Sequence, residues 1–266
     1  MDENFNSQTK RSMQRYFIKM AFNGANYHGW QIQENADTVQ AEVENALSVL
    51  LAANVDVTGA GRTDTGVHAR EYYAHFEVEV PFEHEFIDDL IYRMNSIVPS
   101  DISIIDIFPV KNDVHARFTA LSRTYRYYIC RTKDPFNNNY AWRIFGDLDV
   151  DVMNEAANTL FDYIDFTSFS KLHSEVKTNN CKIMHAKWSE EMGFLVFTIT
   201  ADRFLRNMVR AIAGTLVDVG KGRISVQEFR NIIEARNRGD AGYSVPAKGL
   251  FLEKIEYPED IFLNKE

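Results

Sequence analysis

The sequence predicts an α+β protein in which two halves share one mostly antiparallel sheet flanked by helices. Segments with alternating apolar and polar residues, typical of strands, are interspersed with segments whose apolar residues recur three and four positions apart, typical of helices. The first half follows the order strand, helix, strand, strand, helix, strand, which is typical of a ferredoxin-like unit. The second half repeats this theme, and no low-complexity linker separates the two.

Within the first half, alternating apolar and aromatic residues predict a strand at Tyr16–Phe22. Asp37 or Thr38 can cap a helix with an apolar stripe from Val39 to Leu51. The remaining expected elements are a short strand at 54–58, a half-buried strand at 72–80, a helix at 86–97 stopped by Pro99, and a strand at 102–108.

The second half should begin with a strand at Ser122–Arg131, with Tyr125 and Tyr127 on one face and Arg126 on the other. The other expected elements are a helix at 153–164, strands at 184–190 and 194–201 joined by a tight turn, a helix with the stripe Met208, Ile212 and Leu216 and Gly220 as its C-cap, a helix behind a capping box of Ser225 and Glu228, and a strand at 250–257. We therefore expect a disordered tail at 1–14 and α+β domains at 15–111 and 112–266.

Composition restricts the class of protein. With 266 residues the chain can bury a large core, and its polar start lacks the apolar run of a signal peptide. Only 2 cysteines are present, without a pair spaced as zinc ligands, so a cytoplasmic protein without a metal is expected. No segment reaches membrane-spanning length, and no Gly-rich phosphate-binding loop occurs, so we expect no membrane contact and no cofactor.

The net charge of −9 argues against nucleic-acid binding, but the charges are segregated. Residues 115–133 contain several Arg and Lys and no acid, whereas residues 147–165 contain acids and neither Lys nor Arg. Arg203, Arg206 and Arg210 recur along one side of any helix there. Such segregation can form a positive groove on an acidic protein, although solvated faces of both signs remain the alternative.

The most informative segment is Ala60–Arg70, in which two glycines bracket Asp64 and permit a sharp turn close to a ligand. Arg62 and Arg70 add positive charge that favours an ionised carboxylate, as a nucleophile requires. The alternative is an Asx-turn, in which Asp64 accepts a hydrogen bond from the amide of Gly66.

This segment resembles the Gly-Arg-Thr-Asp-Ala-Gly-Val-His-Ala signature of the TruA family of tRNA pseudouridine synthases, with Thr65 where Ala is usual. Further motifs follow in the family's order, and the resemblance runs from about residue 16 to residue 257: they are Gly24–Gln33, the Arg-x-Tyr-Arg-Tyr element at 123–127, Phe204–Arg210 and Ala247–Phe251. The resemblance implies the pseudouridine synthase fold, with two ferredoxin-like halves.

The resemblance also nominates residues. It implies that Asp64 is the catalytic nucleophile, that Arg210 forms an ion pair with it, and that Tyr125 packs on the target base and could serve as acid or base. It places the aliphatic side chain of Leu250 beside the base. Taken alone, Tyr125 and Leu250 could be ordinary core residues and Arg210 a surface charge.

Three other arginines are candidates for RNA contacts. Arg62 lies next to the nucleophile and could enter the base stack to help extrude the target nucleotide. Arg123 and Arg126 are interleaved with tyrosines, a pattern suited to RNA because rings stack on bases while guanidinium groups hold phosphates.

We therefore expect a homodimeric enzyme that isomerises uridine to pseudouridine in the tRNA anticodon stem-loop, at positions 38–40, as the resemblance implies. Two other classes remain. Asp64-Thr65-Gly66 is also the motif of aspartic proteases, which need two aspartates and are nearly all β. A non-catalytic RNA-binding protein would share the basic and aromatic pattern but leave uridine unchanged.

Overall fold

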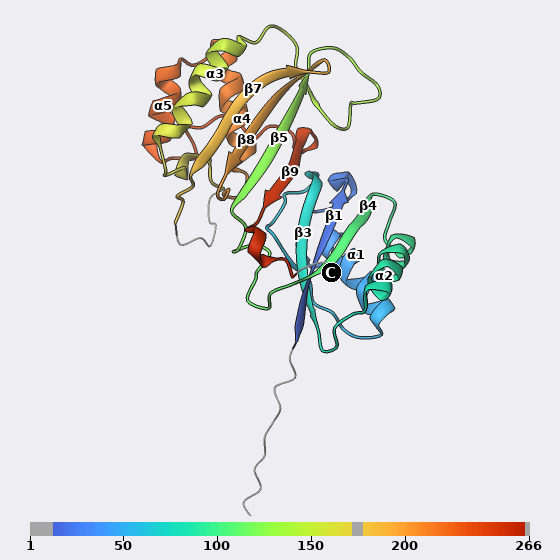
Figure 1. Ribbon diagram of the computed structural model, residues 1–266. Helices are drawn as coiled ribbons and strands as arrows, with labels where there is room; N and C mark the ends of the chain where they lie inside the picture. The colour runs from blue at the N-terminus through green and yellow to red at the C-terminus, as the bar shows by residue number, and fades with distance from the viewer. Residues whose placement is uncertain (1–12, 172–177, 264–266) are drawn as a thin grey trace, which may run out of the picture.

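The chain forms a mixed α/β structure around one large, mostly antiparallel sheet (Figure 1). The computed structural model describes residues 13–171 and 178–263. The strands follow the order β4-β1-β3-β9-β5-β8-β7, and β3 and β9 pair in parallel within it. Their bounds are β1 Gln14–Phe22, β3 His68–Val78, β4 Ile102–Val110, β5 Ser122–Cys130, β7 Ile183–Glu191, β8 Phe194–Ala201 and β9 Leu250–Glu256, with the short β2 Thr58–Gly59 beside β3 and β6 Trp142–Arg143 beside β5.

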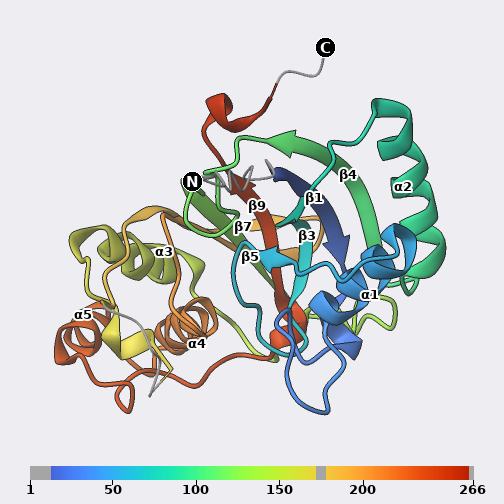
Figure 2. The same cartoon turned by 90° about the horizontal axis from the view of Figure 1, so that it is seen from below.

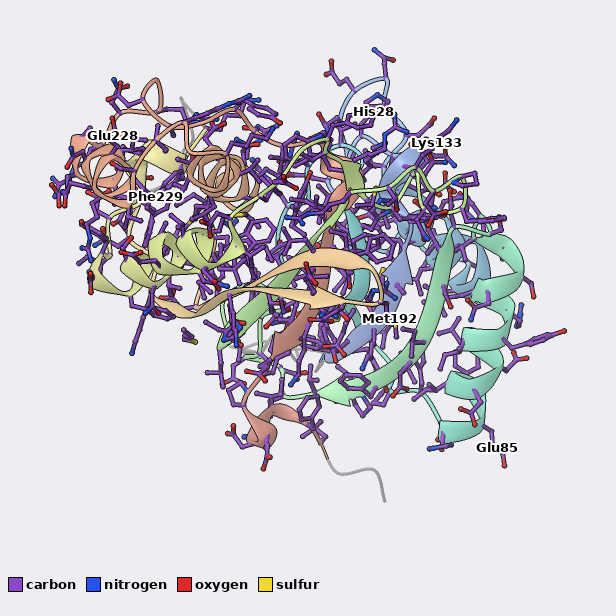
Figure 3. All side chains as sticks on the ribbon, turned by 90° about the horizontal axis from the view of Figure 1, so that it is seen from above. His28, Glu85, Lys133, Met192, Glu228 and Phe229 are labelled. Carbon is purple, nitrogen blue, oxygen red and sulfur yellow. The ribbon has the colours of Figure 1, made fainter. Side chains whose placement is uncertain are left out.

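Two groups of helices cover the sheet, one on each half (Figure 2). Helices α1 (Val39–Leu51) and α2 (His84–Ile97) pack on the first half. Helices α3 (Val150–Asn158), α4 (Met208–Gly220) and α5 (Val226–Ala235) pack on the second half. Each group turns its apolar side chains into the core, as Glu228 and Phe229 of α5 illustrate (Figure 3): Phe229 is fully buried and Glu228 exposed.

Strand β9 joins the two halves, although it is the last strand in the sequence. It lies between β3 and β5, and its residues contribute to both apolar cores. Leu252 and Ile255 belong to the first core and Leu250 to the second. Burial of such side chains contributes roughly 1.5–3 kcal/mol each, so β9 holds the halves in a fixed relation.

The structure confirms most expected elements and corrects some of them. Thr38 is the N-cap of α1, and the capping box of Ser225 and Glu228 is present. The short strand expected at 54–58 is wrong except at its last residue, Thr58. The amides of Val55 and Val57 are instead bound by the side chains of Ser48 and Glu44 of α1, so they are not available to a strand.

The helix expected at 153–164 ends earlier. α3 stops at Asn158 and a tight 3-10 turn follows at Thr159–Asp162, which leaves Phe161 and Ile164 exposed rather than in the apolar stripe. Gly220 is the last residue of α4 rather than its cap, and the chain reverses at Gly222, with a φ of 65°. β6 was not expected from the sequence.

The expected tail at 1–14 falls mostly on residues 1–12, which lie outside the described residues, while Gln14 already belongs to β1. In the part of the chain that the structure describes, every helix is too short or too polar to cross a bilayer.

Candidate active site

Asp64 lies in the loop between β2 and β3, and the first glycine-rich motif supports that loop. Added Cβ atoms on Gly24 and Gly29 would lie 2.0 Å from the carbonyl oxygen of Val67 and 2.2 Å from that of Thr63, respectively. The two loops therefore pack backbone against backbone, as only glycine allows. The motif at 24–33 therefore holds the Asp64 loop in place.

The Asx-turn alternative for Asp64 is wrong. The amide of Gly66 donates to the carbonyl of Tyr27 (3.3 Å), and the turn closes through the backbone, from the amide of Val67 to the carbonyl of Asp64 (3.1 Å). The carboxylate of Asp64 is therefore not used to close the turn and can interact with other groups. It points to the start of α4, with its side chain about one fifth exposed.

Arg210, in the first turn of α4, holds this carboxylate. Its Nη1 donates to Oδ2 of Asp64 at 3.2 Å, and its Nε donates to the carbonyl oxygen of Val245 at 2.7 Å. The second bond fixes the guanidinium plane, so the first has a defined direction. The sequence brought Asp64 and Arg210 together only through the family resemblance, and the structure places them in contact.

Arg206 is a second cation at the carboxylate, and the sequence did not identify it as a site residue. Its Nε lies 3.7 Å from the other oxygen, Oδ1 of Asp64. The only signal was its spacing of four from Arg210. The helix on which this spacing was expected begins at Met208, so Arg203 and Arg206 lie in the turn that precedes α4.

Tyr125 lies where the two halves meet, because its ring packs against both apolar cores. The register of β5 with β9 shifts between Thr124 and Tyr125, and such bulges redirect side chains beside active sites. The ring meets Phe204 edge to face at 5.2 Å between centroids. The pKa of Tyr125 is raised to about 12, mainly by burial; Arg123 opposes this rise and the Asp64 carboxylate adds to it. The phenol is therefore neutral at physiological pH.

Arg123 and Arg126 are placed differently from a pair of phosphate ligands. Arg123 donates to backbone carbonyls, among them those of Asp202 (2.7 Å) and Ala60 (3.3 Å), and so ties the Asp64 loop to the end of β8. Arg126 projects from the other face of β5 and pairs with Glu191. Neither guanidinium contacts Asp64.

The remaining candidates are divided between surface and core. Arg62 is exposed, two residues before Asp64. Leu250 is buried in the second core, to which Val67, three residues after Asp64, also belongs. The expectation that Arg70 adds positive charge at the Asp64 carboxylate is wrong. Arg70 lies on β3, where its guanidinium pairs with Glu253 (3.4 Å), because β3 begins at His68 instead of residue 72.

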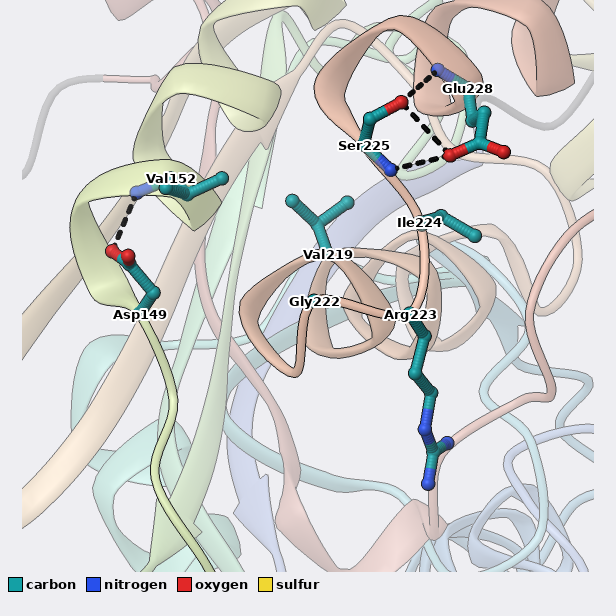
Figure 4. A pocket seen from close by; sticks show the side chains of 8 residues that line it. All are labelled: Asp149, Val152, Val219, Gly222, Arg223, Ile224, Ser225 and Glu228. Carbon is teal, nitrogen blue, oxygen red and sulfur yellow. Dashed lines mark hydrogen bonds between the residues drawn. The ribbon is translucent and has the colours of Figure 1, made fainter.

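Two cavities lie away from this site. One, of about 380 Å³, is at the far end of α4 (Figure 4), where Asp149 caps α3 and Ser225 and Glu228 cap α5. The other, of about 480 Å³, lies between Glu71 and the segment Lys254–Glu259. Among the described residues no group of three or more His, Cys, Asp or Glu side chains is arranged to hold a metal.

Comparison with known proteins identifies relatives of the whole chain. A family model described as tRNA pseudouridine synthase matches residues 156–258. The tRNA pseudouridine synthase A of Parabacteroides distasonis is 54% identical over 253 residues, covering 94% of this chain and 98% of that protein. The same-named protein of Clostridium acetobutylicum is 37% identical, covering 92% and 100%. Among solved structures, CRISPR endoribonuclease Cse3 bound to RNA aligns with a TM-score of only 0.20 at 10% identity, covering 79% of this chain and 93% of that one, which indicates nothing about the fold.

Proposed function

The chain belongs to the tRNA pseudouridine synthase family, an isomerase family, and we propose that Asp64 is its nucleophile. The observation that carries this proposal is the asymmetric environment of the carboxylate. Oδ2 is held by Arg210 at 3.2 Å, while Oδ1 has only the looser contact with Arg206 at 3.7 Å, and the side chain is about one fifth exposed. One oxygen is thereby oriented and the other is only weakly held, which is an arrangement that suits a carboxylate nucleophile.

The reaction conserves all atoms of the nucleoside. Asp64 attacks the uridine at C6 of the base or C1′ of the ribose, and the N-glycosidic bond breaks. The uracil rotates, C5 bonds to C1′, the proton on C5 leaves, and N1 gains a proton. Release of the carboxylate restores the enzyme, so the cycle consumes no cofactor.

Tyr125 is suited to hold the target base. Its ring borders the Asp64 loop, and Phe204 fixes its orientation from the side. With a pKa of about 12, the phenol is a hydrogen-bond donor at neutral pH and a poor general base. We therefore assign Tyr125 to stacking on the base, with Leu250 supporting the loop from the core.

The nucleotide must leave its helix to reach Asp64, and the exposed Arg62 is placed to occupy the vacated stack. We assign Arg123 to holding the Asp64 loop, in view of its backbone partners, and leave both Arg123 and Arg126 out of the phosphate contacts.

The finer features of the proposal rest on the family resemblance. These are action on positions 38–40 of the anticodon stem-loop, a homodimer and a cytoplasmic location. We also propose that each half is a ferredoxin-like unit. The order β4-β1-β3, with β2 pairing with β3 on the side away from β1, supports this for the first half. A protease and a binding module without activity do not fit the family.

The test is Asp64→Asn, which keeps the side chain's size and removes its charge. Tritium release from tRNA carrying 5-tritiated uridine should vanish, while tRNA binding persists. Ser225→Ala, in the distant capping box of α5, is the matched control and should retain turnover. An active Asp64→Asn enzyme would refute the nucleophile, and mapping of the converted nucleotides would test positions 38–40.

A further inference from the structure

Two arginines contact Asp64, but only one is fixed. Arg210 is bound to the carbonyl of Val245 at 2.7 Å, and 20% of its side chain is exposed. The Nε of Arg206 lies 3.7 Å from Oδ1, beyond hydrogen-bond distance, and 51% of its side chain is exposed. The second contact is thus a loose, solvated ion pair, of a kind that contributes little to stability.

The backbone of Arg206 is nevertheless anchored. Its carbonyl accepts a hydrogen bond from the amide of Lys171 at 3.1 Å, and the amide of Met208 donates to the carbonyl of Leu205 at 3.1 Å. Leu205 itself is buried. Among residues 13–171 and 178–263, Asp64 is the only residue with which the Arg206 side chain forms an ion pair or hydrogen bond. The guanidinium can therefore turn away from Asp64 without disturbing the turn that carries it.

Nucleophilic attack by Asp64 requires that the Arg206 guanidinium turn away from it. Arg206 faces Oδ1, the oxygen left free by Arg210, and a carboxylate oxygen that faces a cation is a weakened nucleophile. A guanidinium needs another anion in exchange, and RNA supplies phosphodiesters, which arginine binds with two parallel hydrogen bonds. The nearby N-terminus of α4 also favours a negative charge at this position.

We propose that Arg206 binds the backbone phosphate adjacent to the extruded uridine and thereby uncovers Oδ1 of Asp64. The idea rests on the proposed role of Asp64 as nucleophile. It makes substrate binding and exposure of the nucleophile one event, because the same guanidinium serves both anions in turn.

The test combines a protein change with an RNA change. Wild type and Arg206→Gln are compared on anticodon stem-loop hairpins in which the phosphate 5′ or 3′ of the target uridine is replaced by a neutral methylphosphonate. With wild type, one of these replacements should weaken binding about tenfold, as expected for a charge-assisted contact. With Arg206→Gln, binding to the unmodified hairpin should be about tenfold weaker, and neither methylphosphonate should weaken it further.

The salt dependence gives a second readout. The slope of log K against log salt should fall by about 0.7–0.9 in Arg206→Gln, corresponding to one phosphate contact. Arg223→Gln, at the far end of α4, removes the same charge and should leave both the slope and the methylphosphonate effect unchanged. Arg206→Lys keeps the cation and should retain the methylphosphonate effect.

If Arg206→Gln and the methylphosphonate replacement weakened binding independently, so that their effects added, the proposal would be overturned. A salt slope that Arg206→Gln leaves unaltered would also overturn it. Failure of the proposed function is recognised separately, because wild type would then bind the hairpin and release no tritium.

Discussion

Replacing Arg210 with lysine keeps the positive charge but removes the fork of donors that links Val245 to Asp64. In the wild type, Nε and Nη1 of one rigid plane reach these two acceptors at 2.7 and 3.2 Å. A lysine has one nitrogen at the end of a flexible chain and can serve one acceptor at a time. The carboxylate of Asp64 would then lose its fixed direction even though its charge is still compensated.

The size of the effect follows from the geometry. A hydrogen bond between charged groups contributes about 1.5–3 kcal/mol, and the exposure of 20% and 21% for the two side chains favours the lower part of that range. Since 1.36 kcal/mol corresponds to a factor of ten in rate, we expect Arg210→Lys to lower kcat about 10- to 30-fold. KM should change little, because the lost contact orients the proposed nucleophile, Asp64, and is not expected to bind RNA.

Single-turnover tritium release at saturating tRNA measures this rate, and thermal unfolding shows whether the variant is folded. Arg223→Lys at the other end of α4 is the matched control. A rate within twofold of wild type for a folded Arg210→Lys variant would refute the positioning argument. A loss confined to KM would indicate an RNA contact instead.

Two further predictions concern stability. At Gly29, φ is +96° and an added Cβ would lie 2.2 Å from the Thr63 carbonyl oxygen, so Gly29→Ala should lower the unfolding free energy by about 2 kcal/mol or more in denaturant titrations. Gly61→Ala, where nothing lies within 4 Å, should change it by less than about 0.5 kcal/mol, and equal effects would disprove the clash. Burial, aided by Arg15, lowers the pKa of His75 from 6.5 to about 4. The unfolded chain therefore takes up this proton first, and stability should fall by up to about 3 kcal/mol between pH 6.5 and 4. His75→Asn should abolish this part of the pH dependence, and a persisting slope would rule the histidine out.

The sequence predicted the elements whose signals are local. Alternation marked β1, β5 and β8, and the capping residues Thr38 and Ser225 marked two helix starts, because caps depend on neighbouring atoms only. It failed where distant groups compete for the backbone. The amides of Val55 and Val57 are taken by side chains of α1, which no local pattern indicates.

The candidate site also combines a feature with a local signal and features that depend on distant residues. The motif around Asp64 was visible in the sequence, whereas its partners come from a turn more than 140 residues away. Arg206 was noticed as one of a periodic set, but its proximity to Oδ1 depends on how the turn before α4 meets the loop after β2. Arg70 is close to Asp64 in the sequence, yet it pairs with Glu253 instead because it already belongs to strand β3.

The central position of β9 in the sheet has a consequence for folding during synthesis. His68 of β3 pairs with Phe251 of β9, and β9 in turn pairs with β5. A nascent polypeptide that ends before residue 250 therefore lacks the strand that joins the two halves and helps to set the distance between Asp64 and Arg210. The protein should remain catalytically silent during its own synthesis and acquire activity only when the ribosome has released the stretch that closes the sheet.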